Sequence, residues 1–226
     1  SVLLTGASTG IGFATARHLA ERRLRVFAGV RREQDAERLR AEGLKEIVPV
    51  ILDVTRADEL QAARAQIERE LEASGEAGLA GVVNNAGLAL PAVQEFIEVA
   101  EFRRQIEVNL IGVVAVNRAF LALVRKANGR IVNVGSLGGY NAAPFLGPYA
   151  ASKFALEGLS DALRRELRPF GLQVALVEPG SVATPIWEKS LAYGAELRKQ
   201  LPDAELRFFA GRALFTQNPD LLALRS

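Results

Sequence analysis

The sequence predicts an α/β fold in which one parallel sheet is covered by helices on both faces. Between residues 2 and 177, short apolar runs alternate with longer segments of helical periodicity. The runs are apolar throughout, which is typical of parallel strands buried on both faces. Right-handed crossovers then give a doubly wound sheet with strand order 3-2-1-4-5-6 and a possible seventh strand.

The elements follow in order along one domain spanning residues 1–226. We expect strands at 2–5, 24–30, 46–52, 79–83, 131–134 and 172–177, with a weak seventh at 213–216. We expect helices at about 10–22, 33–42, 55–73, 99–126 and 148–168, and a mobile substrate lid at about 184–212. Thr55 is a candidate N-cap, with Asp58 three residues on.

Composition excludes several classes of function. The chain has 226 residues, 49% of them hydrophobic, and a net charge of +2, which is too weak to argue for nucleic acid. The absence of cysteine excludes disulfides and thiolate sites, and a single histidine, His18, nearly excludes a metal site or a serine–histidine triad. No apolar run reaches eighteen residues and no signal peptide is visible, so we expect a cytoplasmic protein without a membrane span. The abrupt start within a strand, without methionine, indicates missing amino-terminal residues.

A glycine-rich turn between the first strand and first helix is typical of dinucleotide binding. Glycines let the backbone approach a pyrophosphate, which the amides at the helix start can hold. The residues that would do this are Gly6, Ser8, Thr9, Gly10, Ile11 and Gly12.

The end of the second strand bears on the choice of dinucleotide. An acidic residue usually binds the ribose of NAD here, but this chain has Arg31-Arg32. We therefore favour NADP(H), with Arg31 or Arg32 on the 2′-phosphate, and keep NAD(H) as a possibility; the alternative is two solvated arginines. After the third strand, Asp53, which precedes Val54, could accept from the adenine amino group or serve as a turn aspartate.

A tyrosine and a lysine lie one helical turn apart, at Tyr149 and Lys153. This spacing places both side chains on one face of a helix. A lysine ammonium close to the phenol should lower the tyrosine pKa by roughly one to three units, so that the phenol can exchange a proton near neutral pH. Ser136, at the end of a strand, could donate to the same substrate oxygen. The alternative for an isolated pair of this kind is a surface contact.

The motifs TGASTGIG, NNAG, a later serine and YxxxK, in this order and spacing, resemble the short-chain dehydrogenase/reductase family from residue 2 to about Thr184. The resemblance implies a Rossmann-type fold and reversible hydride transfer. It implies that Asn85, Ala86 and Gly87 lie beside the adenine ribose and that Pro179, Gly180, Val182 and Thr184 hold the nicotinamide. It assigns Asn109 to a helix kink and a proton relay, although a simply hydrogen-bonded core asparagine is the alternative.

An apolar wall should line the substrate pocket. The candidates are Leu137, Tyr140, Phe145 and Trp187, beside Ser136, with Leu88, Leu90, Ala142, Leu146 and Ile186. They indicate a hydrophobic secondary alcohol or ketone, as in the steroid and retinol branch that the stretch GSLGGYNAAPFLGPYAASKFALEGL is similar to, although some of them could merely pack the loop.

Two other functions and an assembly are left open by the sequence. Reduction of 3-oxoacyl groups on a carrier protein would need a basic docking patch, for which Arg103-Arg104 and Arg164-Arg165-Arg168 are candidates. A non-catalytic NADP(H) sensor is the third reading, against which the intact Ser-Tyr-Lys set argues. The resemblance implies a homodimer or homotetramer formed through helices 99–126 and 149–168, where Ala150, Ala151, Ala155 and Gly158 permit close packing or merely face the sheet.

Overall fold

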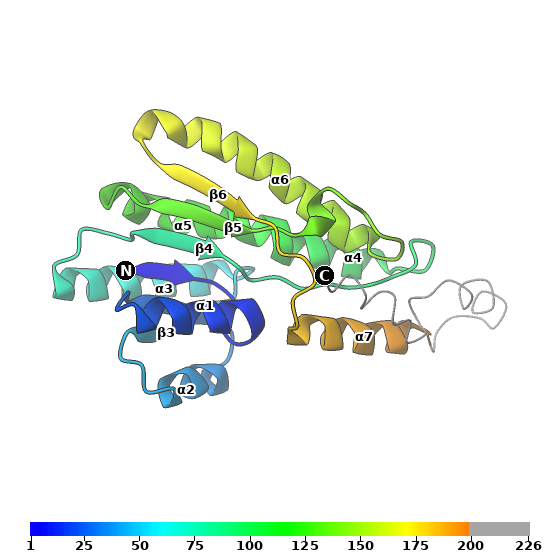
Figure 1. Ribbon diagram of the computed structural model, residues 1–226, viewed down its shortest axis with the longest axis horizontal. Helices are drawn as coiled ribbons and strands as arrows, with labels where there is room; N and C mark the ends of the chain where they lie inside the picture. Colours follow the sequence, from blue (N-terminus) through cyan, green and yellow to red (C-terminus); the bar gives the residue numbers. More distant parts are fainter. Residues whose placement is uncertain (199–226) are drawn as a thin grey trace.

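The computed structural model describes residues 1–198 and contains the predicted parallel sheet (Figure 1). Six strands lie in the order β3-β2-β1-β4-β5-β6, and every neighbouring pair is parallel. The strands are β1 (Val2–Leu4), β2 (Val26–Val30), β3 (Ile47–Ile51), β4 (Gly81–Asn84), β5 (Arg130–Val134) and β6 (Gln173–Val177). The fold class and strand order predicted from the sequence are therefore confirmed.

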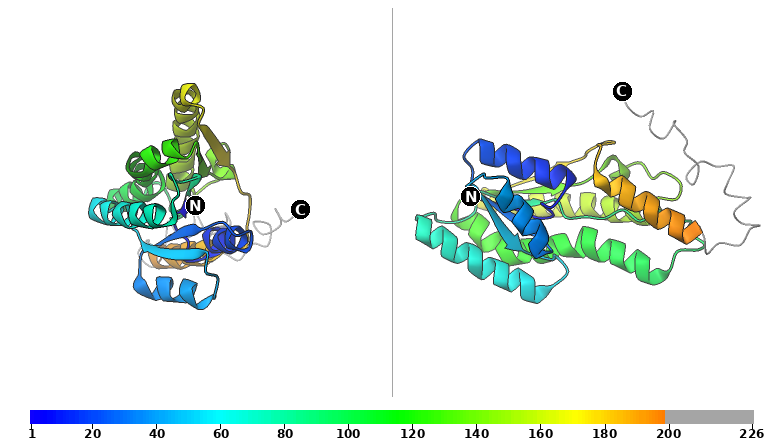
Figure 2. Two further views of the ribbon diagram at one scale, coloured as in Figure 1. Left: turned by 90° about the vertical axis from the view of Figure 1, so that its left-hand side faces the viewer. Right: turned by 90° about the horizontal axis from the view of Figure 1, so that it is seen from below.

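Helices cover the sheet on both faces (Figure 2). One face carries α1 (Gly10–Glu21) and α2 (Glu33–Ala41), and the other carries α3 (Ala57–Ser74), α5 (Gly112–Lys126) and α6 (Gly147–Leu167). The remaining helical elements are α4 (Val99–Ile106), a π-helical turn η1 (Glu107–Ile111), two 3₁₀ turns, η2 (Leu137–Gly139) and η3 (Arg168–Phe170), and α7 (Pro185–Arg198).

Two apolar cores result, because successive strand residues point to opposite faces of the sheet. Leu3 packs into the core shared with α3 and α5, and Leu4 packs into the core shared with α1 and α2. Phe27 and Phe120 are fully buried in the larger core. Burial on both faces explains why the strands are apolar at every position.

The helix predicted at residues 99–126 is continuous but not uniform. It begins as α4, widens into the π-helical turn η1 and continues as α5. This stretch is long and apolar enough to cross a membrane, with a mean hydropathy of 1.7, and 39% of its most apolar window is buried. Val116, Phe120 and Leu123 lie in the larger core, whereas Val99, Ile111 and Val114 are exposed.

One predicted cap is wrong. The N-cap of α3 is Arg56, not Thr55. Thr55 donates its backbone N–H and its hydroxyl to Asp53 Oδ1, at 2.9 and 2.7 Å. Thr55 therefore belongs to a turn stabilised by the Asp53 side chain and does not cap the helix.

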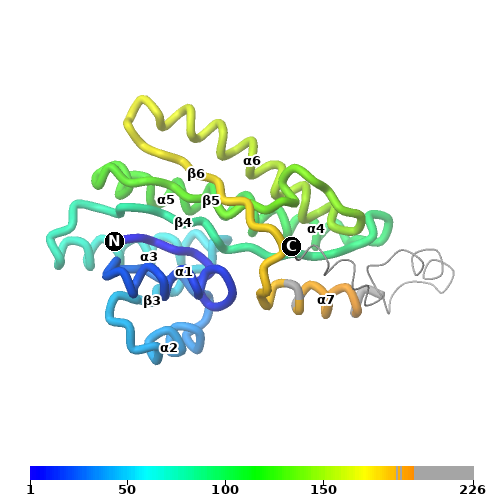
Figure 3. The backbone as a smooth tube through the Cα atoms, viewed as in Figure 1, coloured from blue at the N-terminus to red at the C-terminus, as the bar shows by residue number. Residues whose placement is uncertain are grey.

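The chain after β6 crosses to the carboxyl edge of the sheet, where α7 lies beyond the amino end of α1 (Figure 3). The helix α7 occupies the first part of the predicted lid. The rest of that lid and the predicted strand at 213–216 fall outside the residues that the structure describes.

Candidate active site

A cavity of about 410 Å³ lies at the carboxyl ends of the strands. Loops after β1, β2, β3, β4, β5 and β6 all contribute to its wall, as expected where a doubly wound sheet changes direction. Apart from Arg32, the alternative to Arg31, every residue predicted to bind the dinucleotide or to take part in catalysis lines it: Gly6, Ser8, Thr9, Gly10, Ile11, Gly12, Arg31, Asp53, Val54, Asn85, Ala86, Gly87, Asn109, Ser136, Tyr149, Lys153, Pro179, Gly180, Val182 and Thr184.

The glycine-rich turn has no room for side chains. Gly6 has φ +68°, and a Cβ on it would lie 2.8 Å from the Cα of Ala86. A Cβ on Gly12 would lie 2.2 Å from the carbonyl oxygen of Gly6. Only glycine permits this approach between the first turn, the first helix and the loop after β4.

A polar side chain on each side ties the β1 turn to the loop after β4. The Asn85 Nδ2 donates to the carbonyl oxygens of Thr5 and Gly6, at 2.9 and 3.0 Å. In return the Thr5 Oγ1 accepts from the backbone N–H groups of Asn85 and Ala86, both at 3.0 Å. Thr5 was not among the predicted site residues, and its position at the end of β1 was the only available signal.

The amino end of α1 fits a pyrophosphate. The helix starts at Gly10, and its N-cap Thr9 makes no side-chain capping bond. The first-turn amides therefore remain available to phosphate oxygens and carry the positive end of the helix dipole. A Cβ on Gly10 would lie 3.1 Å from the Cβ of Thr184, so the segment after β6 closes over this turn.

The two arginines after β2 have different surroundings. Arg32 donates to the carboxylate of Asp35, with Nε 2.9 Å from Oδ2. Arg31 lines the cavity and forms no ion pair with any side chain that the structure describes. Arg31 is therefore the residue that can meet a ribose phosphate. Asp53 also lines the cavity but serves as a turn aspartate as well, through the bonds from Thr55.

Ser136, Tyr149 and Lys153 meet where β5 ends and α6 begins. Tyr149 lies in the first turn of α6, and the Ser136 hydroxyl hydrogen-bonds its phenol. The Ser136 Oγ also accepts from the backbone N–H of Gly138 at 3.1 Å, which fixes its direction. The Lys153 Nζ donates to the carbonyl oxygen of Val134 at 2.7 Å and lies 5.8 Å from the centre of the Tyr149 ring.

The predicted lowering of the Tyr149 pKa is wrong for this structure. Burial raises the pKa of Tyr149, and the hydrogen bond from Ser136 opposes this only in part. Burial also lowers the pKa of Lys153 to about 8, against the opposing charge of Glu157. Near neutral pH the site therefore holds a protonated phenol beside a mostly protonated amine.

Asn109 lies in the π-helical turn and is 1% exposed. Its Oδ1 accepts from the N–H of Leu88, and its Nδ2 donates to the Leu88 carbonyl and to the Ser152 Oγ, all between 2.9 and 3.0 Å. The side chain thus joins the loop after β4 to α6. Because its amide is already bonded to Leu88 and Ser152, a proton relay at this position would have to use the backbone of the π-helical turn. Gln105, one turn earlier, also bonds Leu88 and Leu90 and was missed by sequence reasoning.

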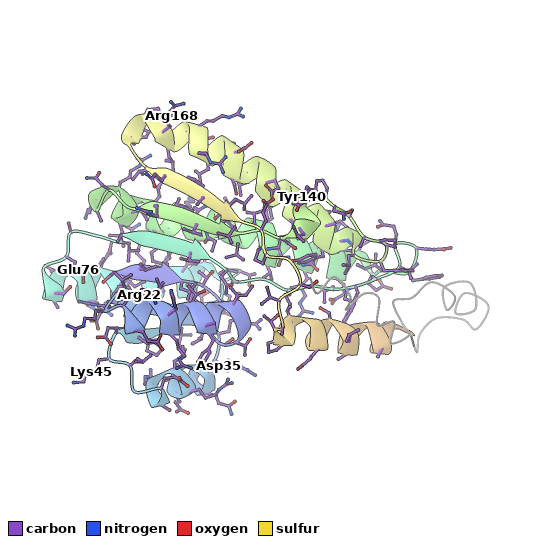
Figure 4. All side chains as sticks on the ribbon, in the orientation of Figure 1. Arg22, Asp35, Lys45, Glu76, Tyr140 and Arg168 are labelled. Carbon is purple, nitrogen blue, oxygen red and sulfur yellow. The ribbon has the colours of Figure 1, made fainter. Side chains whose placement is uncertain are left out.

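The predicted substrate residues are only partly brought together. Leu88, Leu90 and Ile186 line the cavity, and so does Tyr193 of α7. Leu137, Tyr140 and Phe145 do not line it. Tyr140 is 60% exposed and lies at the surface beside α6 (Figure 4).

The reason lies in the short turn after Ser136. Leu137 begins the 3₁₀ turn η2, is 43% exposed and packs against Gly180. Phe145 adopts φ +66°, and its carbonyl accepts from the N–H of Ala92, so its backbone joins two loops. Trp187 belongs to α7, but its side chain is outside the described part of the structure. Among the side chains that the structure describes there is also no group of three or more His, Asp or Glu that could hold a metal.

A doubly wound parallel sheet whose carboxyl edge carries a glycine-rich turn and a Ser-Tyr-Lys set defines the class: a dinucleotide-dependent oxidoreductase. The family whose model is described as short chain dehydrogenase matches residues 1–193, and the chain belongs to that family. Its members use NAD(P)(H), and the structure fits such a coenzyme through the glycine turn, the uncapped start of α1 and the cavity between them.

Several relatives match most of the chain. It is 41% identical over 224 residues to 17-beta-hydroxysteroid dehydrogenase type 6 of Bos taurus, covering 98% of this chain and 69% of that protein. It is 42% identical over 189 residues to retinol dehydrogenase 16 of Homo sapiens, covering 83% of this chain and 58% of that protein. The chain spans between 57% and 71% of the lengths of the curated relatives it matches.

Solved structures show the same architecture. A short-chain dehydrogenase from Streptomyces avermitilis superposes with a TM-score of 0.74 at 27% identity, over 98% of this chain and 90% of that one. ElxO with NADP bound gives a TM-score of 0.75 at 26% identity, over 86% of this chain and 78% of that one.

Proposed function

We propose that this chain interconverts a hydrophobic secondary alcohol and its ketone, with Tyr149 as general acid and base. The observation that carries the proposal is the placement of Ser136, Tyr149 and Lys153 on the wall of the same cavity as the glycine-rich turn. A dinucleotide lying along the cavity would have its phosphates at the amino end of α1. Its nicotinamide would then face the phenol, beside Pro179 and Gly180.

Each catalytic side chain has a distinct task. The bound coenzyme supplies or accepts the hydride. Tyr149 gives its proton to the carbonyl oxygen in reduction and takes one from the alcohol in oxidation. The phenol is protonated near neutral pH, which is the form that acts as the acid in reduction. Ser136 orients the substrate oxygen by hydrogen bonding.

Lys153 and Asn109 support this proton transfer. The Lys153 ammonium uses one N–H on Val134, which leaves two for ribose hydroxyls of the coenzyme. Its charge also stabilises a phenolate whenever one forms. Asn109 holds the π-helical turn and the loop after β4 in place, and the backbone of that turn is the part left for the proton relay.

NADP(H) is the coenzyme we favour. Arg31 faces the cavity without a partner among the described residues, whereas no acidic side chain occupies the end of β2. A free guanidinium suits a phosphate, which it can bind through two N–H groups. NAD(H) remains the alternative coenzyme.

The substrate class follows from the apolar wall and from the relatives. Leu88, Leu90 and Ile186 line the end of the cavity near the loop after β4. The relatives of matching sequence include proteins named as steroid and retinol dehydrogenases. Reduction of carrier-bound acyl groups has less support, because two of the five candidate docking arginines are already paired, Arg104 with Glu101 and Arg164 with Asp161. A non-catalytic sensor has less still, because the catalytic set is intact.

A substrate panel tests the proposal. NADPH oxidation is followed by absorbance with steroid ketones, retinal and 3-oxoacyl thioesters, each at matched concentrations. We expect turnover with the steroid ketones or retinal at least tenfold above that with the thioesters. Faster turnover of the thioesters would instead establish the carrier-protein function, and binding of NADPH without any turnover would establish the sensor.

We also propose that two copies associate through the helices that cover the larger core. Ile111 and Val114, on η1 and α5, and Phe154, on α6, are large apolar side chains that remain between 43% and 45% exposed. Ala151, Ala155 and Gly158 are exposed on the same face of α6, although Ala150 faces inward. An apolar face with small residues suits close packing against a second copy.

A further inference from the structure

Two carboxyl groups meet behind the turn that carries Ser136. Glu157 follows Lys153 by one helical turn on α6, and Glu178 comes directly after β6. The two side chains are within hydrogen-bonding reach of each other. The Glu157 Oε1 is buried, and no donor reaches it from the described part of the chain. Ionised carboxylates only accept, so a pair of them here would repel each other and leave this oxygen unsatisfied.

The Ser136 turn is shaped around the Glu157 carboxyl. A Cβ on Gly139 would lie 2.7 Å from Glu157 Oε1, and one on Gly135 would lie 3.4 Å from the same atom. These two glycines flank Ser136 on either side. The turn therefore fits closely around the carboxyl group. A displacement of Glu157 moves the backbone that orients the Ser136 side chain.

Glu178 stands at the other side of this turn. The N–H of Gly135 donates to the carbonyl of Val177 at 2.7 Å, and the N–H of Leu137 donates to the carbonyl of Pro179 at 3.2 Å. These two carbonyls belong to the residues on either side of Glu178. The carboxyl pair thus lies where the Ser136 turn, the catalytic helix and the Pro179–Gly180 segment of the cavity wall are joined.

The cations near the two glutamates also have other partners. Arg164 is paired with Asp161 and also donates to the carbonyl of Val174 at 3.0 Å. The Lys153 ammonium is bonded to Val134, and the charge of Glu157 raises the pKa of this lysine. Burial, and then the neighbouring Glu178, raise the pKa of Glu157; Asp161 acts in the same direction and Arg164 opposes it. The two cations, Arg164 and Lys153, favour an ionised Glu157, whereas burial, Glu178 and Asp161 favour a proton on the pair.

We propose that Glu157 and Glu178 share one proton, and that the resulting carboxyl–carboxylate hydrogen bond positions the Ser136 turn and Lys153 for catalysis. Neither glutamate lines the cavity, so both are positioning residues. Loss of the shared proton leaves two like charges that push α6 and the end of β6 apart. The catalytic consequence rests on the proposed function, whereas the shared proton does not.

The shared proton is tested on the protein itself by carbon-13 NMR of labelled glutamate carboxyls. The Glu157 signal is identified by its loss in Glu157→Gln. We expect it to titrate at a pH at least one unit above the bulk of the glutamate signals, and to move toward them in Glu178→Gln, where the charged partner is absent. Titration of Glu157 together with the bulk in the native protein overturns the proposal.

Kinetics then test positioning. Glu157→Ala should lower kcat tenfold or more at every pH, with the Kd for NADPH within twofold of native. Glu157→Gln keeps a donor toward Glu178 but cannot titrate. This variant should have a kcat within about threefold of the native value. It should also lack the fall in activity that the native enzyme shows as the pH rises through the Glu157 titration seen by NMR. Glu166→Gln, an exposed change on the same helix, is the matched control.

The shared proton and its effect on catalysis are tested separately. A glutamine variant with the native pH profile, or one as impaired as the alanine variant, would refute the positioning role. If Glu157→Ala does not fold, the glutamine variant and the native NMR titration still decide. Failure of the proposed reaction would leave the NMR result standing, and failure of the NMR result would leave the Tyr149 assignment intact.

Discussion

Lys153 is only 7% exposed, although it carries a charge at neutral pH. Its ammonium has one fixed acceptor, the carbonyl of Val134, and burial favours the neutral amine more strongly than the charge of Glu157 favours the ammonium. A charge held in this way costs stability, and active sites commonly keep such groups because the reaction needs them. The same residue therefore links stability to catalysis.

Replacement of Lys153 by methionine should stabilise the protein near neutral pH. Burial lowers the pKa of Lys153 from 10.5 to about 8, and a shift of that size corresponds to about 3 kcal/mol of destabilisation below pH 8. Between pH 8 and 10.5 the folded state releases its proton before the unfolded state does, so native stability rises with pH.

Denaturant unfolding at pH 7 and pH 10 checks this. We expect Lys153→Met to exceed the native protein by roughly 1–3 kcal/mol at pH 7. The difference should shrink at pH 10, and activity should be lost. A variant less stable than native at pH 7 would show that the ammonium is stabilised in the fold.

Arg31 should decide between the two coenzymes. Arg31→Asp should weaken NADPH binding at least tenfold more than NADH binding, because a carboxylate repels the extra phosphate where the guanidinium attracts it. Dissociation constants from coenzyme fluorescence measure this. Arg32→Gln is the control, since Arg32 is already paired with Asp35 and should affect both coenzymes alike. Equal losses of both coenzymes in Arg31→Asp would remove the phosphate role.

At the residue scale the sequence located the groups but not their electrostatics. Motif spacing placed all the predicted catalytic and coenzyme residues on the cavity wall. Helical spacing also predicted that Tyr149 and Lys153 share a face. It could not show that Lys153 bonds Val134 or that the phenol is buried, because both depend on how α6 packs against β5. The predicted direction of the Tyr149 pKa was wrong for that reason.

Among the elements, α7 is held over the cavity by one buried side chain. The Ser190 hydroxyl lies 2.7 Å from the carbonyl of Ala89, on the loop after β4, and 2.7 Å from the carbonyl of Ile186. Ser190 is 3% exposed. This contact fixes the helix that bears Tyr193, one of the cavity residues, to the opposite wall.

Ser190→Ala should loosen this helix. A hydrogen bond of this kind is worth about 1 kcal/mol, so we expect the NADPH dissociation rate to rise roughly fivefold. Stopped-flow displacement measures the rate, and Ser181→Ala, at an exposed position after β6, serves as the control. An unchanged rate in Ser190→Ala would mean that α7 does not retain the coenzyme.

Element positions were predictable and local irregularities were not. Apolar periodicity placed the six strands and the helices from α1 to α6 within a few residues, because burial dictates that pattern, whereas α7 lies in a segment predicted only as a lid. The π-helical turn around Asn109 and the buried Gln105 clamp arise from bonds to Leu88, which lies distant in sequence. A polar residue inside an apolar helix was the only sign of either.

For the whole molecule, the strand order follows from handedness and from burial on both faces, which is why the sequence predicted it fully for the six described strands. The predicted seventh strand and most of the lid's later part lie beyond residue 198 and stay predictions. The substrate pocket was predicted less well, since residues after Ser136 turn outward at η2.

Association through α5 and α6 is testable at the same scale. Phe154→Arg puts a charge into the proposed interface and should convert the protein to a monomer, because burying an unpaired charge opposes association. Sedimentation velocity at micromolar concentration measures this. Leu24→Arg, which changes an exposed leucine elsewhere, should leave the assembly unchanged. A native protein that sediments as a monomer would contradict the proposed interface.

Turnover by Tyr149→Phe, measured beside its NADPH affinity, tests the central claim most directly. The variant keeps the ring that packs beside Gly138 and loses only the hydroxyl. We expect the rate of NADPH-dependent ketone reduction to fall by about a thousandfold or more, while the Kd for NADPH stays within threefold of native. Reduction within tenfold of the native rate would contradict the assignment of Tyr149 as the proton donor.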